Sequence, residues 1–448
     1  MRWTLLPLVS DRKRLLVFAP SAYPLGGVAD WLDYTLAGLE GLGWGCRLFV
    51  VEGSGHDPTR YFHRHAWPGA GVVSNPSGSR EGRVRSFARV LNDICPDVVL
   101  SVNLADVYEA VRRLRWRNRQ WHAKVALALH GLESCLLSDI GQEADLLDGV
   151  IGTNRLSVAV AREAGIAPER VQYAPYGVPG VPLDHCVIHR RPLRLLYAGR
   201  IEQEQKRVLD LALILRGVVD LGVDARLSVA GSGPSDFEFR SLIESCGLSS
   251  IVEWLGELNS ASLGRAYRSH DALVITSEWE TGPIVAWEAM SHGLPVVSSR
   301  YIGSGLEGAL VDGGTALLFD VGDIAGAVQT VARLRDDDLR RSIIAGGHAL
   351  VSERYSRKAS VSAWDRALTS VLDAPALPAT QPRLSAPSGR LDRWFGVERA
   401  EDFRRLLRIR FVPDSPGAAW PHTGSSSSGQ AAFLDRARLI DRGVARSP

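Results

Sequence analysis

The stretch SEWETGPIVAWEAMSHGLPVV, from Ser277 to Val297, predicts a turn, a helix and the beginning of a strand. The residues before it, ALVITS, are short and apolar, which is typical of a buried strand. Pro283 suits the first position of a helix and Gly293 commonly ends one, so we expect a helix from Pro283 to about Ser291. The following PVVSS is again strand-like. A strand, helix and strand in this order indicate a parallel sheet covered by helices.

The same alternation runs through most of the chain, in two series separated by a turn-rich join near residues 180–191. It indicates an α/β protein with two doubly wound, Rossmann-like domains that face each other across a cleft. Helical patterns are expected at Val28–Leu42 and from Lys206 to Gly222. The expected strands are RLLVFA (14–19), CRLFVVEG (46–53), DVVLSVN (97–103), KVALALHG (124–131), DGVIGTN (148–154), RLLYAGR (194–200), ARLSVAGSGP (225–234), IVEWLG (251–256), ALVITS (272–277) and PVVSS (295–299).

The length of 448 residues exceeds what one ordinary core needs, which predicts more than one domain. We assign residues 1–182 to an N-terminal, acceptor-side domain and residues 183–373 to a C-terminal domain that binds the donor. The last helix, at about 357–372, is expected to cross back to the first domain. Residues 374–448 form an appendage, with a Pro/Ala/Ser-rich linker followed by a basic amphipathic tail.

Bulk composition excludes several classes of protein. The net charge of +2 argues against a dedicated nucleic-acid binder. The five cysteines have no metal-ligand or redox-motif spacing, so we expect reduced thiols in a cytoplasmic protein. No run approaches the roughly 18 apolar residues of a membrane span, and the N-terminus is too short in its apolar part for a signal peptide.

Candidate site residues follow the strands of the second series. Ligands of doubly wound sheets bind at the carboxyl ends of the strands, where helix N-termini point. Glu280 lies in the loop after ALVITS, and Glu288 lies about one and a half turns into the next helix. The N–H groups of Gly282 and Ile284, on either side of Pro283, would form an anion site at the helix tip.

Two cations complete this candidate site. Arg200 follows the strand RLLYAGR, and Lys206 lies six residues further on, at the start of the predicted helix. A guanidinium and an ammonium at a strand-end loop are suited to a diphosphate, with each charge-assisted hydrogen bond contributing roughly 1.5–3 kcal/mol. Lysine occurs only four times, so its presence here is informative. Gly231 and Gly233, in GSGP, offer a second loop for close approach of a ligand.

The paired glutamates followed by EAMSHGLPVV, together with GR…K, AGSGP and the late ERYS (353–356), resemble the retaining, nucleotide-sugar-dependent glycosyltransferases of the GT4 family, whose fold is GT-B. The resemblance covers about residues 14–370 and is strongest from Leu193 to Asp323. It implies that Glu288 binds the ribose hydroxyls, that Glu280 lies near the transferred sugar, and that Arg200 and Lys206 hold the diphosphate.

The resemblance implies further contacts with the donor. His130, which ends a strand of the first domain, would contact the donor sugar. The turn of Gly26 and Gly27 would lie near the phosphate and the acceptor. The loop from Leu255 to Leu258 would flank the nucleobase. We therefore take Glu280, His130, Arg200 and Lys206 as candidate catalytic residues.

The implied activity is transfer of a sugar from a nucleoside-diphosphate sugar to a glycan or a lipid-linked saccharide, in polysaccharide or glycolipid biosynthesis. The resemblance implies retention at the anomeric carbon, no established protein nucleophile, and no required metal or other cofactor. Positioning and electrostatics would supply the catalysis. Two alternatives remain open at this point: a GT-B epimerase or sugar phosphorylase, and a non-catalytic sugar-nucleotide-binding protein.

The segment YIGSGLEG contains G-x-G-x-x-G, at Gly303, Gly305 and Gly308, which is the pattern of a dinucleotide-binding oxidoreductase. The context is wrong for that function. A long helix should follow, yet Asp312-Gly313-Gly314 arrives almost at once.

Two basic segments suggest peripheral contact with an anionic membrane at the inner face of the cytoplasmic membrane. VRRLRWRNRQWHAK (111–124) combines five arginines and a lysine with two tryptophans, and a second basic amphipathic segment surrounds Trp394 to Phe411. Basic residues near an anionic surface contribute about 1 kcal/mol each. The alternative for 111–124 is an ordinary solvated helix and loop.

Overall fold

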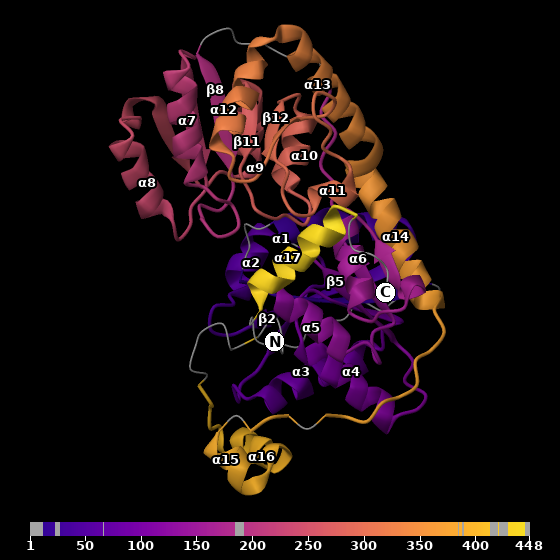
Figure 1. Ribbon diagram of the computed structural model, residues 1–448. Coiled ribbons are helices and arrows are strands. Elements are labelled where there is room, and N and C mark those ends of the chain that lie inside the picture. Colours follow the sequence, from indigo (N-terminus) through magenta and orange to yellow (C-terminus); the bar gives the residue numbers. More distant parts are fainter. Residues whose placement is uncertain are drawn as a thin grey trace. The chain divides into compact units, whose positions relative to one another are not determined.

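The computed structural model describes residues 12–22, 27–65, 67–183, 192–383, 385–387, 389–412, 420 and 429–443. The chain forms two compact units (Figure 1). Unit 1 comprises Met1–Thr153, Ser157–Ala174 and Val361–Phe433, and unit 2 comprises Asn154–Leu156, Pro175–Ser360 and Leu434–Pro448.

Unit 1 is built on a seven-stranded parallel sheet with the order β3-β2-β1-β4-β5-β6-β7. Its strands are almost continuously buried, as expected for a parallel sheet with helices on both faces. The strands are β1 (Lys13–Ala19), β2 (Trp44–Glu52), β3 (Gly71–Ser74), β4 (Val98–Ser101), β5 (Lys124–Leu129), β6 (Gly149–Gly152) and β7 (Val171–Tyr173). The helices along this part of the chain are α1 (Gly27–Gly41), α2 (Pro58–Arg64), α3 (Arg80–Ile94), α4 (Asp106–Arg117), α5 (Ser134–Gln142), α6 (Arg155–Glu163) and the short η1 (Pro168–Arg170).

Unit 2 contains a six-stranded parallel sheet with the order β10-β9-β8-β11-β12-β13. The order reverses between β8 and β11, which places the topological switch point of this sheet at the loops that follow these two strands. The strands are β8 (Leu193–Ala198), β9 (Ala225–Ala230), β10 (Val252–Gly256), β11 (Ala272–Ile275), β12 (Val296–Ser299) and β13 (Leu317–Phe319). The helices are α7 (Asp210–Asp220), α8 (Asp236–Ser245), η2 (Ser249–Ile251), α9 (Ser260–Ser269), α10 (Ile284–Ser291), α11 (Ser304–Glu307), α12 (Ile324–Ala332), η3 (Arg333–Arg335), α13 (Asp337–Leu350) and η4 (Val351–Tyr355).

These two sheets confirm the predicted fold class, and each predicted strand has its counterpart. Three strands had no counterpart in the prediction: β3, β7 and β13. All three are edge or near-edge strands of three or four residues, so their apolar runs are too short to stand out from loops. The remaining helices are α14 (Arg357–Asp373), α15 (Arg390–Phe395), α16 (Val397–Leu407) and α17 (Gln430–Asp441).

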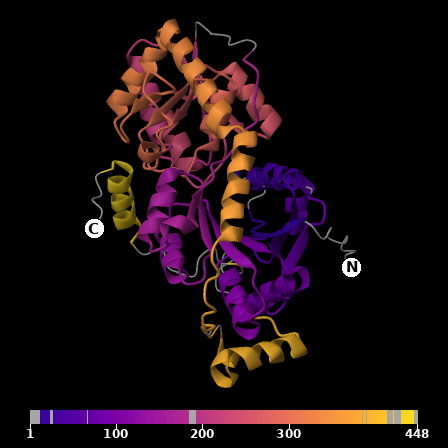
Figure 2. The ribbon, with the colours of Figure 1, turned by 90° about the vertical axis from the view of Figure 1, so that its right-hand side faces the viewer.

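Much of the predicted appendage packs on unit 1. Lys124 Nζ donates to the carbonyl of Ala374, and Arg383 forms an ion pair with Glu143. Trp420 is buried against Phe87 in the core of unit 1. Helices α15 and α16 form a hairpin at one end of this unit (Figures 1 and 2). The domain boundaries predicted from the sequence stay a prediction.

Most of the basic side chains of segment 111–124 do not form the predicted lipid-docking surface. Arg112, Arg113 and Arg115 are buried, and each is paired with acids of neighbouring elements. Lys124 is also buried, 3.8 Å from Asp148. These cations are therefore internal to unit 1, and the prediction is wrong for most of the segment's charge. None of the described helices is long and apolar enough to cross a membrane.

Candidate donor site in unit 2

The loops that follow β8 and β11 carry most of the candidate residues. These strands are hydrogen-bonded neighbours, with Leu195 and Leu196 opposite Ala272 and Leu273. Parallel neighbours end at the same edge of a sheet, so residues 199–206 and 276–283 emerge side by side. Hydrogen bonds join the two loops: Glu278 N donates to Gln205 O at 2.7 Å, and Gln205 Nε2 donates to Trp279 O at 3.1 Å.

Lys206 and Glu280 form an ion pair between these loops. Lys206 Nζ lies 2.6 Å from Glu280 Oε1, and the same oxygen accepts a hydrogen bond from Ser277 Oγ at 2.6 Å. The side chain of Glu280 is 8% exposed and that of Lys206 is 21% exposed. The backbone of Lys206 is held as well, because Thr276 Oγ1 donates a hydrogen bond to its carbonyl oxygen. A nearly buried carboxylate that bonds both a cation and a hydroxyl has its position fixed by these two partners.

The predicted start of the helix at Lys206 is wrong by four residues. Helix α7 begins at Asp210, and Lys206 lies in the turn before it. Arg207 has a φ of 49°, a left-handed conformation that no helix tolerates, and its guanidinium bonds the carboxylate of Asp210. The turn, rather than the helix, therefore sets the direction of the Lys206 side chain.

Arg200 is the exposed cation of the site. Its side chain is 59% exposed, with Nη2 3.1 Å from Glu202 Oε2 and 3.0 Å from Gln205 Oε1. Its backbone is better fixed, because the buried Tyr197 donates its hydroxyl proton to the carbonyl of Arg200. Burial, with Glu280 and Glu202 adding to it, raises the pKa of Tyr197, so this hydroxyl keeps its proton. An exposed guanidinium on a fixed backbone can turn toward a ligand at little cost in structure.

The GSGP loop after β9 packs directly on the backbone that carries Arg200. Gly231 has a φ of +140°, and a Cβ there would lie 1.9 Å from the carbonyl oxygen of Gly199. A Cβ on Gly233 would lie 2.2 Å from the carbonyl oxygen of Ile201. The two glycines are needed because two loops approach each other closely.

The tip of α10 and its first two turns hold the remaining donor-side candidates. Gly282 has a φ of +112° and Pro283 is the N-cap, so the helix begins at Ile284, one residue later than predicted, and ends at Ser291 as predicted. The buried Tyr267 of α9 donates its hydroxyl to Glu288 Oε2 at 2.8 Å. Burial and the neighbouring Glu288 raise the pKa of Tyr267 well above its ordinary value, so it remains a donor.

Leu258, in the loop after β10, packs on the same core cluster as the start of α10. Leu258 and Ile284 both pack, half-buried, against one core cluster that includes Ala230 and Ala286. The loop after β10, the end of β9 and the start of α10 thus share one apolar support.

His130 lies in unit 1, at the end of β5, and is 9% exposed. Its ring contacts Trp31, with centroids 4.6 Å apart. Burial lowers the pKa of His130 to about 3, so the ring is neutral near pH 7. Gly27 is the first residue of α1, whereas Gly26 lies outside the described residues.

The sequence analysis missed three residues that position the site. Tyr267 orients Glu288, Ser277 bonds Glu280, and Gln205 joins the two loops. Tyr267 sits 21 residues before its partner in another helix, so no local pattern could reveal it. Two of the three could have been predicted, because they lie in or beside loops that follow predicted strands. Gln205 is next to Lys206, and Ser277 ends the predicted strand ALVITS.

The G-x-G-x-x-G segment does not form a dinucleotide-binding turn. The helix within it, α11, has four residues. The backbone N–H groups of Gly303, Gly305 and Leu306 all donate to the carboxylate of Asp441, at 2.8–3.0 Å. A carboxylate of the chain itself occupies the donors that a Rossmann turn would offer to a pyrophosphate.

The group of metal-ligand candidates found in the described part of the chain belongs to unit 1. Asp30, Asp33 and His65 of unit 1 bring their ligand atoms within 4.8 Å of one another, and Asp33 bonds His65 Nδ1 at 2.6 Å. None of the three is among the candidate donor-site residues.

Comparison with known proteins shows that unit 2 is similar to glycosyltransferases. Residues 187–348 match the model of the family described as Glycosyl transferases group 1. A D-inositol 3-phosphate glycosyltransferase of Arthrobacter sp. (strain FB24) is 33% identical over 36% of this chain and 38% of its own length. A phosphatidyl-myo-inositol mannosyltransferase of Mycobacterium leprae is 32% identical over 36% of this chain and 42% of its own length. The chain thus matches less than half the length of these two relatives.

Solved structures match over more of the chain. HepE of Anabaena, in complex with UDP and glucose, superposes with a TM-score of 0.65 and 16% identity, covering 80% of this chain and 100% of its own. This similarity shows that the fold is GT-B, with two Rossmann-like units, as predicted.

Proposed function

Because residues 187–348 belong to the family Glycosyl transferases group 1, we propose that this protein transfers a sugar from a nucleoside-diphosphate sugar to a glycan or lipid-linked saccharide, with retention at the anomeric carbon. The observation that carries the proposal is the convergence of a cation, a carboxylate and a helix tip at the carboxyl edge of β8 and β11. The close pair of Lys206 and Glu280 is its best-defined part. Fold alone would not suffice, since one fold serves many activities.

The donor's diphosphate is proposed to bind Arg200, Lys206 and the N–H groups around Pro283. The exposed guanidinium of Arg200 contacts Glu202 and Gln205 of its own loop. Replacing these partners with phosphate oxygens should therefore cost little free energy. The helix tip adds the partial positive charge of α10. Gly231 and Gly233 keep the adjacent backbone close to the same place.

The nucleoside is proposed to bind beside the diphosphate. The carboxylate of Glu288 is oriented by Tyr267, and a carboxylate has about four acceptor sites, enough to take both ribose hydroxyls in addition. The half-buried Leu258, supported by the same core cluster as the tip of α10, is proposed to flank the base.

The chemistry is proposed to rest on charge stabilisation. As the bond between the anomeric carbon and the leaving diphosphate breaks, the negative charge that grows on the diphosphate is stabilised by Lys206 and Arg200. The acceptor hydroxyl then attacks the same face of the sugar, and its proton passes to the oxygen of the departing diphosphate. Glu280, held beside Lys206 by Ser277, places negative charge near the positive charge that develops on the sugar. His130, neutral because it is buried, would serve as a hydrogen-bonding partner of the sugar rather than as a cation.

In this scheme the phosphates are balanced by side chains and a helix tip, so we propose that no metal or other cofactor is required. For the acceptor we propose a glycan or a lipid-linked saccharide destined for a cell-surface polysaccharide or glycolipid. The phosphatidyl-myo-inositol mannosyltransferase among the relatives supports a lipid-linked acceptor. The work would then take place in the cytoplasm, with peripheral contact to the anionic inner face of the membrane and no role for nucleic acid.

The experiment is a thermal-shift screen of the full chain with UDP-, GDP-, ADP- and dTDP-sugars, followed by assay of nucleotide release from each stabilising donor. We expect one base to stabilise the protein, and the stabilising sugar to be hydrolysed slowly without acceptor. The Glu288→Gln variant should need more donor for the same shift. Glu244→Gln, which alters an exposed glutamate near the C-terminal end of α8 in the same unit, is the matched control.

The alternatives give different results. A binding protein would be stabilised by a nucleotide sugar and release no nucleotide. A phosphorylase would release sugar phosphate only with inorganic phosphate, and an epimerase would return an isomerised nucleotide sugar. Stabilisation by NAD(P) alone would indicate an oxidoreductase.

A further inference from the structure

The α15–α16 hairpin of unit 1 carries its polar side chains inside and its apolar side chains outside. Its inward residues are Asp392 and Arg404, which form a buried ion pair at 2.5 Å, and Glu401, which is fully buried. Among the large apolar side chains that the described residues expose, nearly half lie in this short segment. They are Trp394, Phe395, Phe403, Leu406, Leu407, Ile409 and Val412.

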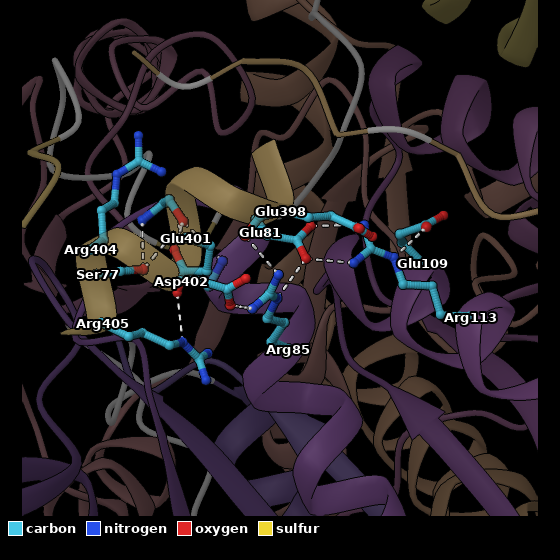
Figure 3. Close-up of polar contacts among 12 residues, drawn as sticks. Ser77, Glu81, Arg85, Glu109, Arg113, Glu398, Glu401, Asp402, Arg404 and Arg405 are labelled. Carbon is cyan, nitrogen blue, oxygen red and sulfur yellow. Dashed lines mark hydrogen bonds and ion pairs between the residues drawn. The ribbon is translucent and has the colours of Figure 1, made fainter. Parts of the chain in front are cut away.

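The inner face is fastened to unit 1 by specific polar contacts. Glu401 Oε2 accepts a hydrogen bond from Ser79 Oγ at 2.6 Å, and Ser79 is also the N-cap of α3. Arg85 of α3 pairs with Asp402 at 2.5 Å (Figure 3). Phe411 N donates to Ser77 O at 2.8 Å. The orientation of the hairpin within unit 1 is therefore fixed, and its apolar side chains are exposed as a consequence.

The outer face is basic as well as apolar. Trp394 is 73% exposed and Leu406 is 78% exposed, so neither contributes to a core. Exposed arginines lie between them along the segment: Arg390, Arg393, Arg399, Arg408 and Arg410. The exposed acids of the hairpin, Glu398 and Asp402, are directed at Arg117 and Arg85 of the neighbouring helices. The net charge of the outer face is thus strongly positive.

We propose that this face, from Arg390 to Val412, is a docking surface for an anionic phospholipid membrane. A helix pair that presents tryptophan and leucine between arginines fits a lipid–water interface, where apolar side chains enter the acyl boundary and guanidinium groups meet phosphates. The charge complementarity favours a lipid surface over a second copy of this chain, whose equivalent face has the same positive charge. The inference rests on the proposed function, which includes contact with an anionic membrane, and assigns that contact to one surface of the protein.

The test is co-sedimentation of the full chain with vesicles of phosphatidylcholine alone and of phosphatidylcholine mixed with phosphatidylglycerol. The wild type should sediment with the anionic vesicles only. The Arg393→Gln/Arg399→Gln/Arg408→Gln variant should bind them on the order of a hundredfold more weakly, at about fivefold for each arginine. The Trp394→Ser/Leu406→Ser/Leu407→Ser variant should lose at least about tenfold.

Matched controls lie on unit 2. Phe237→Ser removes an aromatic ring that is 83% exposed, and Arg226→Gln removes an exposed arginine. Both should bind vesicles like the wild type. All variants alter exposed side chains, so each should keep the wild-type unfolding temperature and the wild-type rate of donor hydrolysis without vesicles.

Three results would overturn the proposal: no binding of the wild type to anionic vesicles, full binding by both hairpin variants, or a wild-type dimer that the Trp394→Ser/Leu406→Ser/Leu407→Ser variant converts to monomer in sedimentation velocity. The last would show a second copy as the occupant. Absence of donor hydrolysis in the wild type would refute the proposed transferase activity. Vesicle co-sedimentation would still show whether the hairpin binds an anionic membrane.

Discussion

Replacing Lys206 with methionine should destabilise unit 2 through the carboxylate that it leaves behind. Glu280 is nearly buried, with Lys206 Nζ and Ser277 Oγ both 2.6 Å from the same oxygen. Removing one partner of a fully buried pair costs about 3–5 kcal/mol. Lys206 is 21% exposed and the Ser277 hydroxyl remains, so we expect the free energy of unfolding to fall by about 2 kcal/mol.

The assay is urea denaturation followed by tryptophan fluorescence, with a double-mutant cycle. The Lys206→Met/Glu280→Gln variant should regain most of the lost stability, because a neutral amide replaces the unpaired charge. Lys358→Met, at an exposed lysine, is the control and should change stability by less than about 0.5 kcal/mol.

Donor hydrolysis separates the structural role of Lys206 from its proposed catalytic role. Both the single and the double variant should release nucleotide slowly, although the double variant is nearly as stable as the wild type. Additive stability effects of the two substitutions would refute the geometry, and a double variant with wild-type turnover would refute the role of Lys206 in stabilising the leaving diphosphate.

Three further outcomes are expected. Tyr267→Phe should raise the KM for the donor about tenfold at nearly unchanged kcat, since Glu288 loses the hydrogen bond that orients it; an unchanged KM in steady-state kinetics would contradict this. The depressed pKa of His130 means that the unfolded chain binds a proton below pH 6.5 that the folded chain takes up only near pH 3. As the pH is lowered from 6.5 toward 3, the free energy of unfolding should therefore fall by up to about 1.4 kcal/mol per pH unit. Urea titrations of His130→Gln should lack this part of the pH dependence. Gly231→Ala should lower the unfolding temperature and cost at least about 1–3 kcal/mol, because its Cβ would strike the Gly199 carbonyl; calorimetry that shows no change would exclude the close approach.

The fold was predictable because its signals are local. Each strand that was predicted appears in the sequence as a continuous apolar run, and the turns between elements carry glycine or proline. The segment from Ala272 to Val297 shows both signals. Adjacency of β8 and β11 also follows from the architecture, which is why Lys206 and Glu280 could be assigned to one edge before their contact was seen. Strands of three residues such as β13 give no comparable signal.

Contacts between distant residues were beyond the sequence. The helix containing Arg112 and Arg113 has enough arginines to suggest a solvated basic face. Glu109 of the same helix is one acidic partner, but the others come from α3 and from the segment after α5. Nothing local indicates that such charges are buried. The same limit applies to Tyr267, whose partner Glu288 lies on another helix.

The C-terminal hairpin illustrates a different limit. Its amphipathic pattern was visible, but a pattern does not say which face is buried. In most helices the apolar face is inside. Here Ser79 and Arg85 of α3 bind the polar face instead, and this reversal could be seen only with both elements in place.

The central claim, that unit 2 holds an activated sugar by its diphosphate and its ribose, is tested most directly by isothermal titration calorimetry with UDP, GDP, ADP and dTDP. At least one diphosphate should bind the wild type, with weaker binding to Glu288→Gln and to Lys206→Met and unchanged binding to Glu244→Gln. Failure of all four to bind, or equal binding to all these proteins, would contradict the account.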